Sequence, residues 1–198
     1  MGVTNVTIAS LLEVLPENLN GVKTCELGDQ MFYLQDPYIL NGIEMKFLKS
    51  YFDYHGGLHC SLDWHGNNGA LKMDFNKQIH GGFNERYDLL TNFGFTEHVS
   101  DQYAAWKNIN DLIKVGGLII SELPAQTNFP GHNDFPYYTL EFFQRLALKC
   151  GYEIEALRYQ QHTVPLAGQV VWCVLKKTKS EFISKEEFAE VEAKLGKN

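Results

Sequence analysis

The hydrophobic and polar positions of this chain follow two periods, one typical of buried strands and one typical of one-sided helices. Residues 87–92 and 118–120 are short apolar runs, which indicates strands buried on both faces of a sheet. Between them, apolar residues recur at three- and four-residue steps and predict a helix with one buried face. These residues are Ala105, Trp106, Ile109, Leu112 and Ile113. Gly116 and Gly117 are expected to end the helix, and so short a connection predicts parallel strands with a right-handed crossover.

Similar units continue along the chain. Further strands are predicted at residues 21–28, 58–62, 70–75, 152–159 and 169–177. Further helices are predicted at residues 7–15, from Asp36 to about residue 55, at 139–151 and at 184–195. Ser184 and Glu187 are spaced as a capping box for the last helix. This order predicts the α/β class, with a single doubly wound sheet of about seven strands.

Domain organisation follows from the same pattern. The chain has 198 residues and contains no repeats, low-complexity stretches or linkers. We therefore expect one domain over residues 1–198, with an N-terminal helix in 1–19, a core in 20–177 and a tail helix in 180–198.

Charge and cysteine content narrow the class of partner. The formal net charge is −7, and the Lys and Arg residues are scattered, which gives no basic surface for nucleic acid or an anionic membrane. No apolar run has the length of a membrane span. The four cysteines show no close pairing and are expected to be reduced thiols of a cytoplasmic protein.

Candidate chemistry gathers where the predicted strands end. Ligands of doubly wound sheets bind beyond the carboxyl ends of the strands, where Glu26, Gly28, Asp63 and Glu122 are expected. A carboxylate such as Asp63 can accept hydrogen bonds from both hydroxyls of a ribose. The pyrophosphate-binding pattern G-x-G-x-x-G is absent, and Asp29 would repel a pyrophosphate, so an NAD-dependent oxidoreductase is the less favoured interpretation.

Five segments together resemble the class I S-adenosylmethionine-dependent methyltransferases. They are ELG at 26–28, SLDWHG at 61–66, KMDF at 72–75, YDLLTNFGFTEHV at 87–99 and LIKVGGLIISELP at 112–124. The resemblance covers roughly residues 20–177. It implies the Rossmann-like methyltransferase fold, with the last strand antiparallel and helices on both faces.

The resemblance also implies a cofactor and its contacts. The cofactor is S-adenosylmethionine, which leaves as S-adenosylhomocysteine. Its methionine end is assigned to Glu26, Gly28 and Gln30, its ribose to Asp63, and its adenine to Asp74 and Phe75. The methyl-transfer rim is assigned to Asn92, Phe93, Gly94 and Phe95. The usual second glycine of the first motif is Gln30 here, and we expect its side chain to replace a backbone contact.

The expected reaction is transfer of the methyl group to an oxygen or nitrogen of a small-molecule acceptor. The sulfonium is already activated, so the protein mainly aligns the reactants, and a base is needed only if the acceptor must lose a proton. His98 and His132 are the candidate bases, with Glu97 as an orienting acid. The sequence leaves open the acceptor, the oligomeric state and a second hypothesis, a catalytically silent binding protein with this fold.

A metal site is not expected. His59 and Cys60 stand in a predicted strand, and the alternation of side chains along a strand points them to opposite faces of the sheet.

Overall fold

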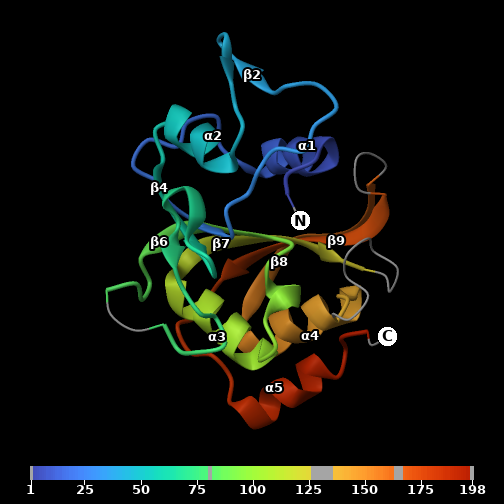
Figure 1. Ribbon diagram of the computed structural model, residues 1–198. Coiled ribbons are helices and arrows are strands. Elements are labelled where there is room, and N and C mark those ends of the chain that lie inside the picture. Colours follow the sequence, from blue (N-terminus) through green and yellow to red (C-terminus); the bar gives the residue numbers. More distant parts are fainter. Residues whose placement is uncertain (1, 80–81, 126–135, 163–166, 197–198) are drawn as a thin grey trace.

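The described part of the protein is built on a seven-stranded sheet in the order β5-β4-β1-β6-β7-β9-β8 (Figure 1). The computed structural model describes residues 2–79, 82–125, 136–162 and 167–196. The strands are β1 (Lys23–Leu27), β4 (Leu58–Asp63), β5 (Leu71–Lys72), β6 (Tyr87–Phe93), β7 (Ile113–Pro124), β8 (Tyr152–His162) and β9 (Gly168–Lys177). In this order, neighbouring strands from β5 through β4, β1 and β6 to β7 pair in parallel. Strand β9 is antiparallel to both β7 and β8. The predicted sheet, including its antiparallel last strand, is confirmed.

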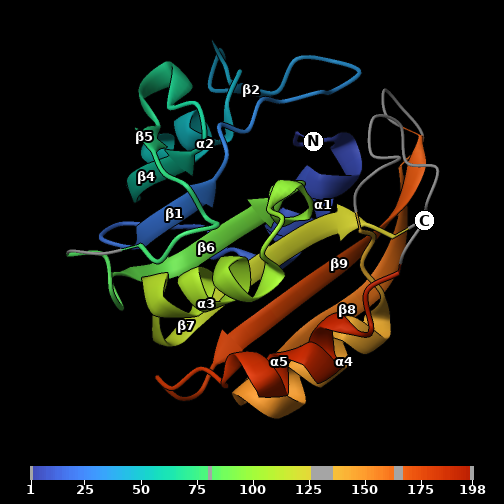
Figure 2. The same cartoon turned by 60° about the horizontal axis from the view of Figure 1, so that its bottom comes forward.

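Helices cover both faces of this sheet, as predicted. Helices α1 (Asn5–Val14) and α2 (Leu48–Tyr54) lie on one face. Helices α3 (Gln102–Leu112), α4 (Leu140–Cys150) and α5 (Lys185–Glu192) lie on the other (Figure 2). Each face has its own apolar core, and β6 contributes Leu89 to one and Leu90 to the other. Helices α1 to α4 pack on one sheet and α5 packs on α3 and α4, so we propose that the chain forms a single domain.

Helix ends follow local capping chemistry. The Asp101 side chain accepts a hydrogen bond from the Ala104 amide and begins α3, and Thr139 does the same for α4. Gly151 ends α4 with a φ of 69°. The capping box of Ser184 and Glu187 is present at α5, as predicted.

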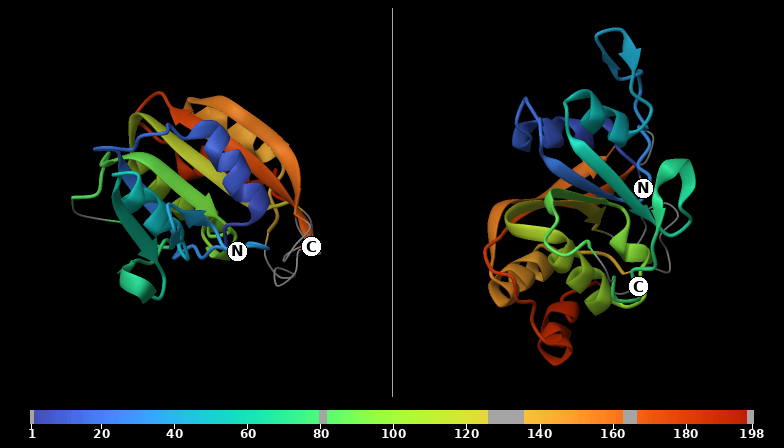
Figure 3. Two further views of the ribbon diagram at one scale, coloured as in Figure 1. Left: turned by 90° about the horizontal axis from the view of Figure 1, so that it is seen from above. Right: turned by 90° about the vertical axis from the view of Figure 1, so that its left-hand side faces the viewer.

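The predicted long helix from Asp36 to about residue 55 is wrong. This segment forms a small hairpin, β2 (Ile39–Leu40) and β3 (Ile43–Glu44), before the shorter helix α2. Asn41 and Gly42 both have positive φ, 47° and 83°, which suits the two-residue turn that Asn-Gly sequences favour. This turn overrides the helical spacing of the apolar residues, and the hairpin projects from the molecule (Figure 3).

Two further predictions are corrected at the residue level. Helix α3 ends at Leu112, and Gly116, with a φ of 87°, lies inside β7 and does not end the helix. Gly117 serves close packing, because a Cβ there would lie 2.8 Å from Ile113 Cγ1. The strand predicted at 70–75 is shorter, since only Leu71–Lys72 pairs with β4.

Two other expectations can be compared with the described residues. The four cysteines are free thiols, as predicted. Among the described helices, none has the length and apolar character needed to cross a membrane.

Candidate functional site

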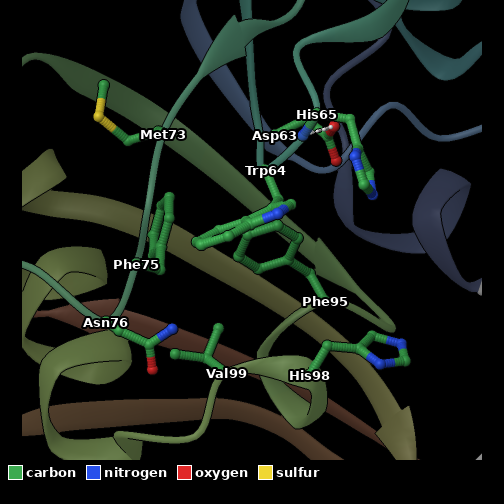
Figure 4. A pocket seen from close by; sticks show the side chains of 9 residues that line it. All are labelled: Asp63, Trp64, His65, Met73, Phe75, Asn76, Phe95, His98 and Val99. Carbon is green, nitrogen blue, oxygen red and sulfur yellow. Dashed lines mark hydrogen bonds between the residues drawn. The ribbon is translucent and has the colours of Figure 1, made fainter.

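A cavity of about 400 Å³ opens where β4, β5 and β6 end (Figure 4). Its walls come from the β4–β5 turn, the segment after β5 and the loop after β6. The lining residues are Asp63, Trp64, His65, Met73, Phe75, Asn76, Phe95, His98 and Val99. The cavity therefore lies at the carboxyl ends of the strands, where the sequence places the ligand site.

Asp63 is the last residue of β4 and is held by the turn that follows it. Its Oδ1 accepts hydrogen bonds from the amides of His65 at 2.7 Å and Gly66 at 3.1 Å. This fixes the carboxylate at the cavity wall, and its Oδ2 makes no hydrogen bond within the described residues. Asp63 thus presents a carboxylate oxygen at the cavity wall, and its binding to ribose hydroxyls stays a prediction.

The apolar wall of the cavity is an aromatic pair. Phe75 and Phe95 meet edge to face with ring centroids 5.0 Å apart. Phe75 is fully buried, and the neighbouring Asn76 is held through its Oδ1 by the Ser100 hydroxyl and the Asp101 amide. An apolar, aromatic wall of this kind suits an adenine ring.

Asn108 of α3 fastens the segment that carries this wall. Its Nδ2 donates to the carbonyls of Phe75 at 3.2 Å and Lys77 at 2.9 Å, and its Oδ1 accepts from the Ile79 amide at 3.0 Å. Asn108 is 1% exposed, so water does not replace these bonds when the side chain is lost. The position of Phe75 therefore depends on a residue of another element.

We expect Asn108→Ala to lower the free energy of unfolding by about 2–4 kcal/mol, since three buried hydrogen bonds are lost. The Ile79 amide should also lose its protection from hydrogen exchange. The matched control is Lys107→Ala, whose ion pair with Asp111 is a partly exposed pair one turn apart, worth about 0.3–0.5 kcal/mol. Equal effects of the two substitutions in denaturant unfolding would contradict the role given to Asn108.

The turn after β1 adjoins the cavity and carries the first predicted motif. Gly28 has a φ of 87°, and a Cβ there would lie 2.6 Å from Gln30 Nε2 and 3.6 Å from the Phe95 ring. Gln30 folds back over this turn, where its Nε2 donates to the Leu27 carbonyl at 2.9 Å. Its side chain thus contacts the backbone of the motif, and the expectation that it replaces a backbone contact to the cofactor stays a prediction.

Two acceptor atoms are left without a partner beside this turn. Glu26 is fully buried; its Oε1 accepts from the Gln30 amide at 2.6 Å, but its Oε2 makes no hydrogen bond within the described part of the chain. The Oε1 atom of Gln30, which is 4% exposed, also has no partner among the described residues. Buried acceptors without donors are costly to a fold, and both atoms are acceptors once Glu26 is ionised, so this pair suits a ligand that supplies N–H groups.

Burial governs the electrostatics of Glu26. It raises the pKa of the carboxyl to about 8, and nearby Asp29 acts in the same direction, while the Gln30 amide and Lys49 oppose the rise. His59 Nε2 lies 3.7 Å from Glu26 Oε2, but burial lowers the pKa of His59 to about 4, so the ring is neutral near pH 7. Glu26 therefore lacks a close cation among the described residues.

The loop after β6 is fixed by a buried network. Asn92 Nδ2 donates to Thr96 Oγ1 at 3.0 Å, and the Tyr138 hydroxyl lies 2.9 Å from the same oxygen and 2.6 Å from Gln102 Oε1. Gln102 Nε2 in turn donates to the carbonyls of Thr96 and Val99. Asn92, a predicted rim residue, thus shapes the loop that carries Phe95 and His98.

Glu97 and His98 lie on this loop with different exposures. Glu97 is 1% exposed, and burial raises its pKa to about 7. His98 lines the cavity, and burial lowers its pKa. Their closest approach, His98 Nε2 to Glu97 Oε1, is 3.9 Å. His132, the other predicted base, lies outside the described residues.

Three remaining predicted site residues have structural contacts. Asp74 caps the turn after β5, where it accepts from the Asn76 amide and pairs with Lys77 Nζ at 3.0 Å. Phe93 stacks on Trp172 of β9 within the core beneath α1 and α2. Gly94 has a φ of 65°, and its amide donates to the Glu122 carbonyl at 2.9 Å. Each of the three therefore has a structural contact, and their contacts to a cofactor stay predictions.

Several residues of the site were missed by the sequence reasoning. Trp64, Met73 and Val99 line the cavity, and Asn108 and Tyr138 hold its walls. The first three stand within the quoted motifs, so their nearness to Asp63 and Asn92 was an available signal. Asn108 and Tyr138 gave none, because each acts on a segment about 30 or more residues away.

Comparisons with known proteins give a fold. No protein-family model and no curated protein matches this sequence. Solved structures do match, at low sequence identity. NodS, an N-methyltransferase from Bradyrhizobium japonicum solved with S-adenosylhomocysteine, gives a TM-score of 0.61 at 9% identity over 89% of each chain. An S-adenosylmethionine-dependent methyltransferase from Mesorhizobium loti gives 0.57 at 13% identity, over 85% of this chain and 96% of that one.

A third similar structure was solved with an acceptor. It is the 1,6-didemethyltoxoflavin-N1-methyltransferase of Burkholderia thailandensis with 1,6-didemethyltoxoflavin and S-adenosylhomocysteine, with a TM-score of 0.57 at 10% identity over 81% of this chain and 72% of that one. At such identities the likeness establishes the fold. The chain has the fold of the class I S-adenosylmethionine-dependent methyltransferases.

Proposed function

We propose that the protein binds S-adenosylmethionine at the carboxyl ends of β1, β4 and β6 and transfers its methyl group to an oxygen or nitrogen of a small-molecule acceptor. The observation that carries the proposal is the unpartnered acceptor pair, Glu26 Oε2 and Gln30 Oε1, beside a cavity walled by Asp63. A methionine ammonium group supplies the N–H donors that these atoms lack. The fold of the similar structures, several of them solved with S-adenosylhomocysteine, supports the same choice.

Each part of the cofactor has a fitting surface. Glu26, Gly28 and Gln30 would hold the methionine end, Asp63 the ribose hydroxyls, and Phe75 with Phe95 the adenine ring. When bound, the sulfonium supplies an activated methyl group. The protein's own residues would then bind and orient the two reactants and exclude water from them. Asn92 shapes the loop along which the acceptor would approach.

Titration with S-adenosylhomocysteine tests this proposal. We expect calorimetric binding in the wild type and an affinity about 10- to 100-fold lower in Asp63→Ala, since charge-assisted hydrogen bonds to the ribose are lost. The matched control is Asp53→Ala, an acid of α2 beside a different pocket, at the ends where β1 and β4 begin. It should bind like the wild type.

The other hypotheses predict different titrations. Binding of NAD(H) without S-adenosylhomocysteine would contradict the proposal in favour of an oxidoreductase. Binding of neither compound would favour a catalytically silent protein with this fold.

A further inference from the structure

A second buried polar group lies on the same face of the sheet as Glu26. Glu122 of β7 and His162 at the end of β8 are 0% and 1% exposed, and His162 Nε2 lies 3.3 Å from Glu122 Oε1. Only β6 stands between β7 and β1, so Glu122 and Glu26 are on strands about 10 Å apart. We propose that His162 accepts the proton of the methyl acceptor and that Glu122 positions it. This inference rests on the proposed methyl transfer.

Glu122 has the contacts of a positioning residue. Its Oε1 accepts the Thr7 hydroxyl hydrogen at 2.6 Å, and Thr7 stands in the first turn of α1. With the Gln160 amide oriented to satisfy its neighbours, its nitrogen donates to Glu122 Oε2 at 3.2 Å and its oxygen accepts from Arg158 Nη2 at 2.9 Å. Both carboxylate oxygens thus accept hydrogen bonds from α1 and β8, which fixes the carboxylate beside His162.

His162 has the opposite character. Among the described residues, neither ring nitrogen has a hydrogen-bond partner, although the side chain is almost completely buried. A carboxylate oxygen 3.3 Å from Nε2 favours the tautomer with its proton on that nitrogen. Nδ1 then keeps an unused lone pair in a dry environment. A buried acceptor of this kind is costly unless a ligand donates to it.

Glu122 and His162 lie beside the loop after β6, along which the methyl acceptor is proposed to approach. The Glu122 carbonyl accepts from the Gly94 amide, so Glu122 adjoins the loop that begins the proposed transfer rim. His98, in contrast, lines the cavity with Asp63 and Phe75, which are assigned to the cofactor. Helix α1 covers the pair, and Ser10, one turn beyond Thr7, is held by Arg158. The cover excludes water, which methyl transfer requires.

The proposed step balances in atoms and electrons. The acceptor gives the proton of an O–H or N–H group to Nδ1 of His162, and the electron pair left behind forms the new bond to the methyl carbon. The carbon–sulfur bond breaks and its pair stays on sulfur, so that the positive sulfonium becomes a neutral thioether while His162 becomes the cation. Glu122 stabilises that cation by its negative charge.

The imidazole nitrogens of the full chain, measured by ¹⁵N NMR, test the positioning directly. We expect His162, assigned by the signals lost in His162→Gln, to carry its proton on Nε2 at neutral pH. Glu122→Gln should increase the share of the Nδ1-protonated tautomer. The control His55→Gln, at the end of α2, should leave the His162 signals unchanged. A wild-type His162 protonated on Nδ1, or an unchanged tautomer in Glu122→Gln, would overturn the proposal.

Two activity-related measurements separate this proposal from the one it rests on. His162→Gln should bind S-adenosylhomocysteine within about threefold of the wild type, yet transfer labelled methyl to a low-molecular-mass cell extract about 10²- to 10⁴-fold more slowly. Undiminished transfer by His162→Gln would overturn the base assignment. A wild type that binds no S-adenosylhomocysteine would refute the methyl-transfer function, and the base assignment with it, whatever the tautomer.

Discussion

Glu26→Gln should make the free protein more stable and at the same time abolish most of its affinity for S-adenosylhomocysteine. The amide keeps the shape of the side chain but cannot become an anion. Burial raises the pKa of Glu26 to about 8, so forming the charge that attracts the methionine ammonium works against folding. The site therefore trades stability for binding at this residue.

The dependence on pH follows from the direction of this shift. Between about pH 4.5 and 8 the folded protein keeps a proton on Glu26 that the unfolded chain has lost, so the contribution of Glu26 to stability falls as the pH rises through this window. Glu26→Gln has no ionisable group at this position and does not lose stability in this window. The difference between its free energy of unfolding and that of the wild type should grow from pH 4.5 to 8, to an order of several kcal/mol.

Cofactor binding should accordingly release a proton near pH 7. Calorimetry of the wild type with S-adenosylhomocysteine in phosphate and in Tris, whose ionisation enthalpies differ, should give a binding enthalpy that changes with the buffer by close to one proton per site. The control is Glu97→Gln, which removes a second buried acid with a raised pKa that is not assigned to the methionine end. Its binding enthalpy should change with the buffer as in the wild type. A buffer-independent enthalpy in the wild type would show that Glu26 is already ionised or is not used.

Lys177→Met should destabilise the protein by about 2–5 kcal/mol. Lys177 is 1% exposed, and its Nζ donates to the carbonyls of Asn110 at 2.8 Å and Ile113 at 2.9 Å, at the end of α3. A third contact at 3.0 Å joins it to Glu85. Methionine fills similar space but donates nothing, so the helix carbonyls remain buried without partners.

The neighbouring Lys176 provides a matched control. It lies on the same strand and pairs with Glu153 at 3.7 Å, but both side chains are largely solvent-exposed. Lys176→Met should change the free energy of unfolding by less than about 1 kcal/mol, as exposed ion pairs do. Denaturant unfolding of both variants compares the two positions. Similar losses would mean that Lys177 contributes only as an exposed charge.

The sequence predicted best where a local pattern and a local cap agree. The apolar runs of β6 and β7 and the helices α4 and α5 were located, because strand burial and capping residues act within a few positions. Where two local signals competed, the prediction failed. The spacing of Ile39, Leu40 and Ile43 indicated a helix, but the Asn41-Gly42 turn set the backbone.

By itself, then, the sequence determined the doubly wound sheet and the acids Glu26 and Asp63 at the strand ends, because periodicity and strand-end position are properties of neighbouring residues. The antiparallel last strand was expected from the resemblance of five segments to a known family. The tertiary structure alone decided which buried groups meet. Glu122 and Thr7 are 115 positions apart, and His162 joins them only because β9 brings β8 to β7. Burial of Glu26 and the missing partner of His162 likewise depend on elements from both ends of the chain, which no local pattern records.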